Sequence, residues 1–191
     1  SYKNNKEIHE FTKKFKIPLF SGSEGDVIDR IYQTAKTFDA TIVVRITADC
    51  PFMDPKILDE MISIFIENLV KYDILVNNKP PTFPHGLDAE IYSFQTLDIL
   101  WNSIKKPELR EWFPLFIEKN SELFRIHNFS INTNLSHLRW TVDYQEDFEF
   151  TQKIFEKLYH LKKIFLIDDI LELLEKQPEL SDINSKYVGY H

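Results

Sequence analysis

Apolar and polar positions along the chain switch between helical and extended patterns. The first segment is amphipathic, with Ile8, Phe11 and Phe15 spaced three and four residues apart between Lys and Glu residues. Residues 41–46 are β-branched and almost wholly apolar, which is typical of a strand buried on both faces. Asp54-Pro55 predicts a helix start, because Asp is a good N-cap and Pro suits the first helical position.

The same reasoning predicts an order of elements for the whole chain. Helices are expected at residues 2–15, 26–38, 54–70, 95–104, 108–120 (broken near Pro114), 146–159 and 167–176. Strands are expected at residues 17–20, 41–46, 74–76, 89–93, 124–131 and 138–142. Strands that alternate with helices indicate a doubly wound α/β fold with a mostly parallel sheet. No linker divides the sequence, so we expect a single domain over residues 1–191.

Two of the predicted strands end in the same pattern, Arg-x-Thr-x-Asp, at residues 45–49 and 139–143. Side chains alternate across a strand, so the Arg, Thr and Asp share one face and the Asp falls at the carboxyl end. Open α/β sheets bind ligands at that edge. Asp49 and Asp143, delivered there from different strands, can hold a hard cation such as Mg²⁺ together with substrate phosphates.

Each of these residues also has a structural interpretation. Asp49 can cap the turn that follows its strand, and Asp143-Tyr144-Gln145-Glu146 fits a capping box at the start of the next helix. Arg45 and Arg139 can be ion-pair partners rather than groups that clamp a substrate. The sequence leaves both interpretations open.

Composition narrows the class of protein. The net charge of −7 argues against a general nucleic-acid binder, which would carry a basic surface. The single cysteine, Cys50, excludes an intramolecular disulfide and fits a reducing compartment. Neither a signal-peptide pattern nor an apolar run of bilayer length is visible, so we expect a cytoplasmic protein with no membrane partner. The four glycines are too dispersed for a backbone phosphate cradle, which must lie elsewhere or be built differently.

Four segments in order along the chain carry a more specific signal. They are residues 22–30 (GSEGDVIDR), 45–55 (RITADCPFMDP), 84–93 (PHGLDAEIYS) and 138–147 (LRWTVDYQED). They resemble the motifs G-S-E-x-D-V-L-D-R, R-I-T-x-D-C-P-x-x-D-P, P-x-G-L-D-V-E-V-F-S and L-R-L-T-V-D-x-x-E-D of cytidylyltransferases of the spore-coat-polysaccharide type. Because the four segments span nearly the whole chain, their combined match is specific.

The resemblance implies a fold and a reaction. The fold would be a three-layer, Rossmann-like α/β structure of the nucleotide-diphospho-sugar-transferase kind with a mostly parallel sheet. The reaction would transfer CMP from CTP to an acidic sugar and release pyrophosphate, for surface polysaccharide biosynthesis, with Mg²⁺ neutralising the phosphates. Related enzymes activate 3-deoxy-octulosonate, sialic acid and legionaminic acid, and such relatives suggest a homodimer.

The motifs also imply roles for single residues. Those carried over are Asp49 and Asp143 for metal binding and catalysis, Gly22, Ser23 and Arg30 near the nucleotide, Thr47 at the ribose, and His85, Asp88, Glu90 and Arg110 for the substrate. Alternatives remain for some of them: Arg30 can be solvated or paired with Asp26, and Asp88 and Glu90 can form an exposed strand face.

The chain departs from the family pattern at its start. The family begins with a strand and the loop A-R-x-G-S-x-R-L-P-x-K, which holds the triphosphate, and no such segment occurs here. Roughly 60 residues, or two strand–helix units, are expected before residue 1. We favour a fragment of a longer protein, with completion by another chain or a non-catalytic remnant as alternatives. The family's R-E-H-V-T-P is also altered, to Arg-Glu-Trp-Phe-Pro-Leu at residues 110–115.

Two other functions are kept as hypotheses. A metal-dependent glycosyltransferase of similar fold would bind Mn²⁺ through a carboxylate pair and use a sugar nucleotide as donor. A non-catalytic interaction module would bind no nucleotide in a metal-dependent way. Release of pyrophosphate from CTP, as opposed to release of a nucleoside diphosphate, separates the first hypothesis from the cytidylyltransferase.

Overall fold

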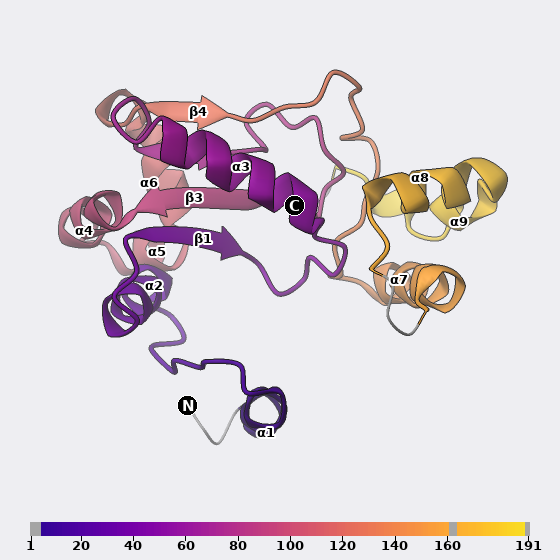
Figure 1. Ribbon diagram of the computed structural model, residues 1–191, viewed down its shortest axis with the longest axis horizontal. Coiled ribbons are helices and arrows are strands. Elements are labelled where there is room, and N and C mark those ends of the chain that lie inside the picture. Colours follow the sequence, from indigo (N-terminus) through magenta and orange to yellow (C-terminus); the bar gives the residue numbers. More distant parts are fainter. Residues whose placement is uncertain (1–4, 161–163, 190–191) are drawn as a thin grey trace. The chain divides into compact units, whose positions relative to one another are not determined.

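The computed structural model describes residues 5–160 and 164–189, which form two compact units, each built from two stretches of chain (Figure 1). Unit 1 comprises Ser1–Val43 and Tyr92–Arg125, and unit 2 comprises Val44–Ile91 and Ile126–His191. The predicted single domain over residues 1–191 stays a prediction. Within the described residues, no helix combines the length and the apolar character needed to cross a membrane.

Unit 1 is helical. Its helices are α1 (Lys6–Phe15), α2 (Val27–Thr37), α4 (Phe94–Ser103), α5 (Pro107–Glu111), α6 (Phe113–Lys119) and the 3-10 turn η2 (Ser121–Leu123). Tyr32 of α2 packs its ring on Phe94 and Trp101 of α4, at centroid distances of 5.4 and 4.6 Å. The Trp101 indole N–H donates to Asp29 (2.7 Å), so polar contacts fix the same pair of helices.

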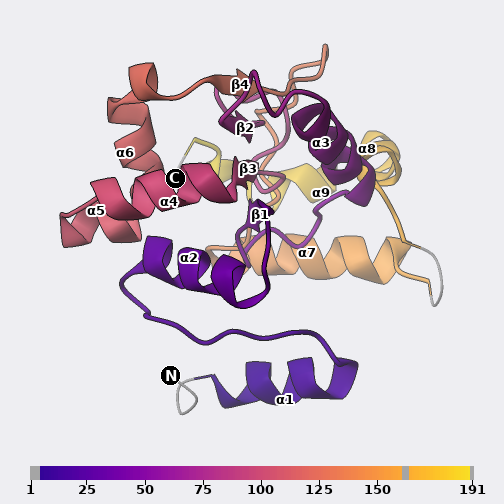
Figure 2. The same cartoon turned by 60° about the vertical axis from the view of Figure 1, so that its left-hand side comes forward.

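Unit 2 is organised on a four-stranded sheet. Its strands are β1 (Ile42–Ile46), β2 (Ile74–Val76), β3 (Ala89–Ser93) and β4 (Ile126–Asn128), in the order β1-β3-β2-β4. The start of β1 and the end of β3 belong to unit 1. Strands β2 and β4 pair in parallel with Ile74 opposite Ile126, whereas β3 runs against β1 and β4 (Figure 1). Helix α3 (Pro55–Glu67) runs along one face of this sheet and buries Met61 and Phe65 (Figures 1 and 2).

The remainder of unit 2 is a group of helices: α7 (Gln145–Leu158), α8 (Ile167–Lys176), α9 (Glu179–Asp182) and the 3-10 turn η3 (Ser185–Tyr187). An aromatic cluster around Phe52 joins them to the segment after β1; its other rings are Trp140, Phe150, Phe155 and Phe165. The buried Asp54 caps α3 through the Lys56 N–H (2.8 Å) and also accepts from Ile167 N–H at the start of α8 (3.0 Å). One carboxylate therefore fixes two helix starts.

Most predicted elements are confirmed close to their expected bounds, including the helix that begins after Asp54. The predicted helix 108–120 is two helices that meet at Trp112, because Pro114 fits the first turn of a new helix. The prediction for residues 2–4 lies outside the described residues. Strand 124–131 is shorter, since only Ile126–Asn128 pairs.

Two predicted strands are wrong. Residues 17–20 form no strand, and Ile17 and Leu19 remain exposed. Residues 138–142 are extended but form only one isolated bridge, between His85 and Arg139. Their backbone groups bond to loops instead. A strand needs a neighbouring strand to pair with, and the apolar composition of residues 138–142 does not show whether one is present.

Candidate active site

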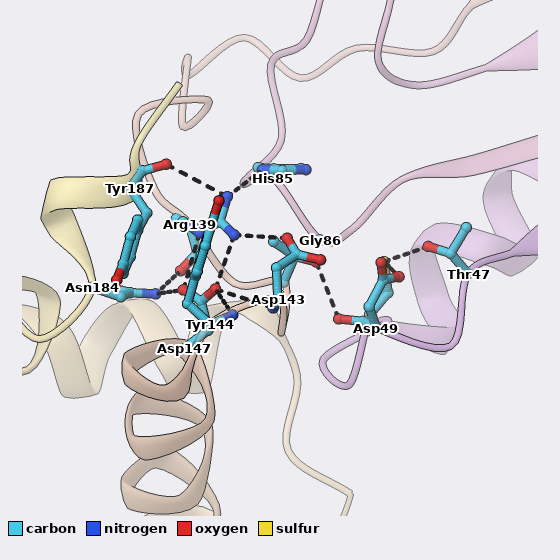
Figure 3. A network of polar contacts seen from close by, with 12 residues as sticks. Thr47, Asp49, His85, Gly86, Arg139, Asp143, Tyr144, Asp147, Asn184 and Tyr187 are labelled. Carbon is cyan, nitrogen blue, oxygen red and sulfur yellow. Dashed lines mark hydrogen bonds and ion pairs between the residues drawn. The ribbon is translucent and has the colours of Figure 1, made fainter. Parts of the chain in front are cut away.

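The two Arg-x-Thr-x-Asp motifs meet in unit 2 (Figure 3). Strand β1 ends at Ile46, and the turn that follows brings Asp49 beside the second motif. The Val142 N–H donates to the Asp49 carbonyl (2.9 Å), and the Thr141 hydroxyl donates to the same oxygen (3.3 Å). Asp49 and Asp143 therefore lie on segments that are hydrogen-bonded to each other, although the second segment is not a strand of the sheet.

Both carboxylates remain accessible. Within the described residues, the half-buried Asp49 side chain accepts one weak contact, from the Cys50 thiol (3.5 Å), and the Asp143 side chain is 44% exposed. The described residues contain no group of three or more His, Cys, Asp or Glu side chains that could enclose a metal ion. Carboxylate oxygens completed by water and phosphate oxygens are the usual ligands of Mg²⁺, so these two side chains have the donor chemistry that such an ion requires.

Beside Asp143 lies a buried ion pair. Arg139 donates to both oxygens of Asp147 (3.0 and 2.9 Å) and to Asp143 (2.7 Å), and the Arg139 and Asp147 side chains are 1% and 0% exposed. Asn184 donates to the Arg139 carbonyl and to Asp147, both at 2.9 Å (Figure 3). This network positions the segment that carries Asp143.

The network sets the charge of its members. Burial alone would raise the pKa of Asp147, but hydrogen bonds from Arg139, Asn184 and the Asp143 and Tyr144 N–H groups lower it below its usual value. Burial would likewise lower the pKa of Arg139, whereas Asp147 and Asp143 raise it. Both groups are therefore ionised, and Arg139 is balanced by two carboxylates.

The capping box that was the alternative interpretation of Asp143 is not formed by that residue. The first turn of α7 is capped by Asp147, which accepts from the Tyr144 N–H (3.1 Å), and Tyr144 occupies the N-cap position. Glu146 instead binds Lys186 and the Tyr187 hydroxyl, and the hydrogen bond from Lys186 lowers the pKa of Glu146. Asp143 does not cap the helix, and its carboxylate instead has a structural role as an ion-pair partner of the buried Arg139 (2.7 Å).

A glycine lets the loop after residue 83 approach the second motif. Gly86 has φ +107°, and a Cβ atom there would lie 2.5 Å from the Thr141 nitrogen and the Trp140 carbonyl carbon. The His85 N–H donates to the Leu138 carbonyl (3.0 Å), and the Trp140 N–H donates to the His85 carbonyl (2.7 Å). Only glycine combines this conformation with this close approach.

Replacing Gly86 with Ala is expected to destabilise the protein. Backbone strain alone would lower the free energy of unfolding by roughly 1–3 kcal/mol, and the overlap with Trp140 and Thr141 adds to that loss. Urea denaturation of the purified variant measures the effect. Gly25→Ala is the matched control, because a Cβ there meets nothing within 4 Å. Equal stability of the two variants would contradict the requirement at residue 86.

The predicted substrate residues of unit 2 fall into two groups. His85 and Asp88 line a cavity of about 420 Å³. Glu90 is buried in β3, and its carboxylate accepts from Arg45 (2.8 Å). Asp88 precedes the strand and accepts from the Gly86 N–H (3.2 Å). Arg45 is thus an ion-pair partner, and the exposed face proposed for Asp88 and Glu90 is not found.

The predicted nucleotide residues Gly22, Ser23 and Arg30 lie together in unit 1. Arg30 donates to the carbonyls of Ser23 (2.6 Å) and Glu24 (3.2 Å). The aliphatic part of its side chain packs on Gly22, because a Cβ atom added to Gly22 would lie 3.0 Å from the Arg30 Cγ. Arg30 is therefore not paired with Asp26. The nucleotide role of Gly22, Ser23 and Arg30 stays a prediction.

Arg110, also in unit 1, is occupied by protein groups. It donates to Asp26 (2.6 Å) and to the carbonyls of Trp101 and Ile104 (3.0 and 2.7 Å). These bonds join α5 to the start of α2 and to α4. A substrate role for Arg110 stays a prediction.

Thr47, in unit 2, is exposed, and its hydroxyl lies 3.1 Å from the Cys50 sulfur. Burial raises the pKa of the Cys50 thiol to about 11, so this cysteine is protonated at neutral pH and is no candidate nucleophile. The ribose contact predicted for Thr47 stays a prediction.

Sequence reasoning did not find Asp147 as the partner of Arg139, nor Asn184. Asp147 had a visible signal, since it is the last residue of the segment that resembles L-R-L-T-V-D-x-x-E-D. Asn184 had none, because it lies 45 residues from Arg139 and far from any motif.

The mixed α/β fold is that of a nucleotide-sugar-transferase-like protein. A family model described as cytidylyltransferase matches residues 4–177. The chain belongs to the cytidylyltransferase family, whose members are CMP-transferring nucleotidyltransferases.

Individual relatives agree with this family. A solved structure of a cytidylyltransferase from Leptospira borgpetersenii superposes with a TM-score of 0.87 at 33% identity, over 93% of this chain and 74% of that one. The uncharacterized protein MJ1063 of Methanocaldococcus jannaschii is 29% identical over 96% of this chain and 73% of its own length. The spore coat polysaccharide biosynthesis protein SpsF of Bacillus subtilis is 25% identical over 91% of this chain and 70% of its own length.

Proposed function

We propose that this protein transfers CMP from CTP to a sugar acid and releases pyrophosphate, for polysaccharide biosynthesis. The observation that carries the proposal is the hydrogen-bonded meeting of the two motifs that present Asp49 and Asp143. The name of the Bacillus subtilis relative supports the pathway, and the cytidylyltransferase family supports the transfer of CMP.

The residues of this chain would act mainly by positioning and by charge. Asp49 and Asp143 would hold Mg²⁺, which when bound supplies positive charge against the phosphates. Arg139 keeps Asp143 in place through their 2.7 Å hydrogen bond, while its own charge is balanced by Asp147. Chemistry of this kind needs no covalent intermediate on the protein, because orientation and electrostatic stabilisation lower the barrier.

The acceptor would occupy the cavity lined by His85 and Asp88, which is part of the same unit as the carboxylate pair. The nucleotide roles of Gly22, Ser23 and Arg30 in unit 1, and the ribose contact of Thr47 in unit 2, are proposed separately and on the resemblance alone. A homodimer is proposed on the resemblance alone.

Thermal unfolding in the presence of nucleotide tests the proposal. CTP with Mg²⁺ at about 100 times its dissociation constant should stabilise the folded protein by ~2.7 kcal/mol. For a chain of this size, that stabilisation raises Tm by roughly 5–10 °C. ATP with Mg²⁺ is the control and should leave Tm unchanged.

The products of the reaction distinguish the proposal from its alternatives. Pyrophosphate released from CTP in the presence of a sugar acid supports it. A nucleoside diphosphate released from a sugar nucleotide would indicate a glycosyltransferase. A melting transition that no nucleotide moves would indicate a non-catalytic module.

A further inference from the structure

The turn η3, near the C-terminus, packs against the start of α7. Lys186 and the Tyr187 hydroxyl both contact Glu146, and the Tyr187 ring stacks on that of Tyr144 at a centroid distance of 3.9 Å. Asn184 immediately precedes this turn, and it is 3% exposed (Figure 3). The contacts of η3 with α7 therefore fix the place of a buried amide beside the second motif.

The Asn184 amide nitrogen donates twice within the network around Arg139. One hydrogen bond goes to the Arg139 carbonyl and the other to Asp147 Oδ1, each at 2.9 Å. The first holds the backbone of the second motif, and the second holds the carboxylate that binds the Arg139 guanidinium. Asn184 therefore fixes the two partners of the buried ion pair with respect to each other.

The orientation of the Arg139 guanidinium decides how much of Asp143 is left for a metal ion. The fork formed by Nε and Nη2 faces Asp147 and binds both of its oxygens (3.0 and 2.9 Å). Asp143 receives a single contact, from Nη2 to Oδ2 (2.7 Å), and within the described residues no hydrogen bond or ion pair reaches its Oδ1. A hard cation held by Asp143 needs an oxygen in this state.

A guanidinium that could turn would offer its fork to Asp143 instead. Arginine binds carboxylates preferentially through two parallel hydrogen bonds, and such a pair with Asp143 would occupy both of its oxygens. A cation would then have to displace the guanidinium. Asn184 opposes this turn, because its hydrogen bond to Asp147 Oδ1 keeps that oxygen facing the Nε of Arg139.

We propose that Asn184 is a positioning residue for the metal site. Through Asp147 and Arg139 it restricts Asp143 to one contact with the guanidinium and keeps the second oxygen of that carboxylate available to a divalent cation. Asn184 itself contacts neither the metal nor the substrate. The inference rests on the proposed function for the role of Asp143 in metal binding.

Binding of Mn²⁺ tests this role without a catalytic assay. Mn²⁺ takes the same kinds of oxygen ligand as Mg²⁺, and the decrease of its EPR signal on binding gives a dissociation constant. We expect Asn184→Ala to raise this constant about tenfold, as is usual when a group that orients a metal ligand is removed. Asn184→Ser keeps one hydroxyl donor and should raise the constant less, and this variant carries the comparison if the alanine variant does not fold.

Two control variants separate positioning from stability. Ser185→Ala changes the next residue, whose exposed hydroxyl donates to the Asp182 carbonyl, outside the network around Arg139. Met61→Ala leaves a cavity beneath α3 and should lower Tm. Both controls should bind Mn²⁺ as tightly as the original protein, at a temperature where circular dichroism shows every variant to be folded. An Asn184→Ala protein that binds Mn²⁺ as tightly as these controls overturns the inference.

The Mg²⁺ dependence of pyrophosphate release gives a second measurement. Asn184→Ala should need about tenfold more Mg²⁺ for its half-maximal rate, whereas its rate at saturating Mg²⁺ should approach that of the original protein. A loss of rate that no concentration of Mg²⁺ restores would indicate a purely structural role and would overturn the inference.

Asp49→Asn keeps this inference apart from the proposed function. It should abolish the binding of Mn²⁺, because it removes one of the two proposed metal ligands. Binding that survives in Asp49→Asn, or that is absent from the original protein, would refute the metal assignment and this inference with it. Binding that is lost in Asp49→Asn but unchanged in Asn184→Ala would retain the metal assignment and refute the role of Asn184 alone.

Discussion

Replacing Asp49 with Asn is expected to lower the rate of CMP transfer by about 10³-fold. The amide keeps the size of the side chain but removes the negative charge that a hard cation requires. A bound metal contributes several kcal/mol of charge stabilisation to phosphate chemistry, and each 1.36 kcal/mol corresponds to a factor of ten in rate. Release of pyrophosphate from CTP, measured across a range of Mg²⁺ concentrations, checks both the rate and the metal requirement.

The stability of this variant should change little. The Asp49 side chain makes only the weak contact with Cys50, and the bonds that join the two motifs go to its backbone carbonyl. Asp59→Asn, an exposed substitution of the same kind on α3, serves as the control and should retain full activity. An Asp49→Asn protein as active as this control would disprove the metal assignment.

Replacing Asp147 with Asn is expected to lower the free energy of unfolding by roughly 3–5 kcal/mol, the cost of removing one partner from a buried ion pair. The substitution would remove the fully buried carboxylate that faces the guanidinium of Arg139, which is itself only 1% exposed. It would also weaken the cap of α7, because the Asp143 and Tyr144 N–H groups both donate to Asp147. Urea unfolding at pH 7 measures the loss.

Two further variants separate the charge from the packing. Glu149→Gln lies on the exposed face of the same helix and should change stability by less than about 0.5 kcal/mol. The double substitution Arg139→Met with Asp147→Leu should cost less than Asp147→Asn alone, since it leaves no buried charge without its partner. An Asp147→Asn protein as stable as the Glu149→Gln protein would show that the ion pair of Arg139 and Asp147 does not stabilise the fold.

The pH dependence of unfolding follows from the same pair. The pKa of Asp147 is lowered in the folded protein, so the pair contributes its full stabilisation above the unfolded value of about 3.9. That stabilisation is lost as the pH falls through the folded pKa, because protonation then removes the charge opposite Arg139. The original protein should therefore lose stability more steeply below about pH 4 than Asp147→Asn does.

Short-range patterns in the sequence predicted the helices well. Asp54-Pro55 marks the start of α3 because capping depends on residues within one turn of the helix end. The repeated Arg-x-Thr-x-Asp motif led to the expectation that Asp49 and Asp143 share one sheet edge; their segments are hydrogen-bonded, but the second is not a strand of the sheet. The four family motifs specified the cytidylyltransferase fold, which the Leptospira borgpetersenii structure matches.

The strands and the partners of charged groups were harder to predict. Residues 138–142 have the composition of a strand, but a strand exists only where another chain segment offers its backbone groups in register. The position of Glu90, two residues after Asp88, indicated that the two side chains share one face. The structure instead buries the Glu90 carboxylate against Arg45.

The sequence by itself therefore determined the helix starts, the order of most elements and the family, because each depends on neighbouring residues or on a contiguous motif. Only the tertiary structure decided that Arg139 is held by Asp147 and Asn184, and that Gly86 lies against Trp140. These features depend on which groups from distant parts of the chain share a dry interior, where every charge and polar atom must be paired or must cost stability.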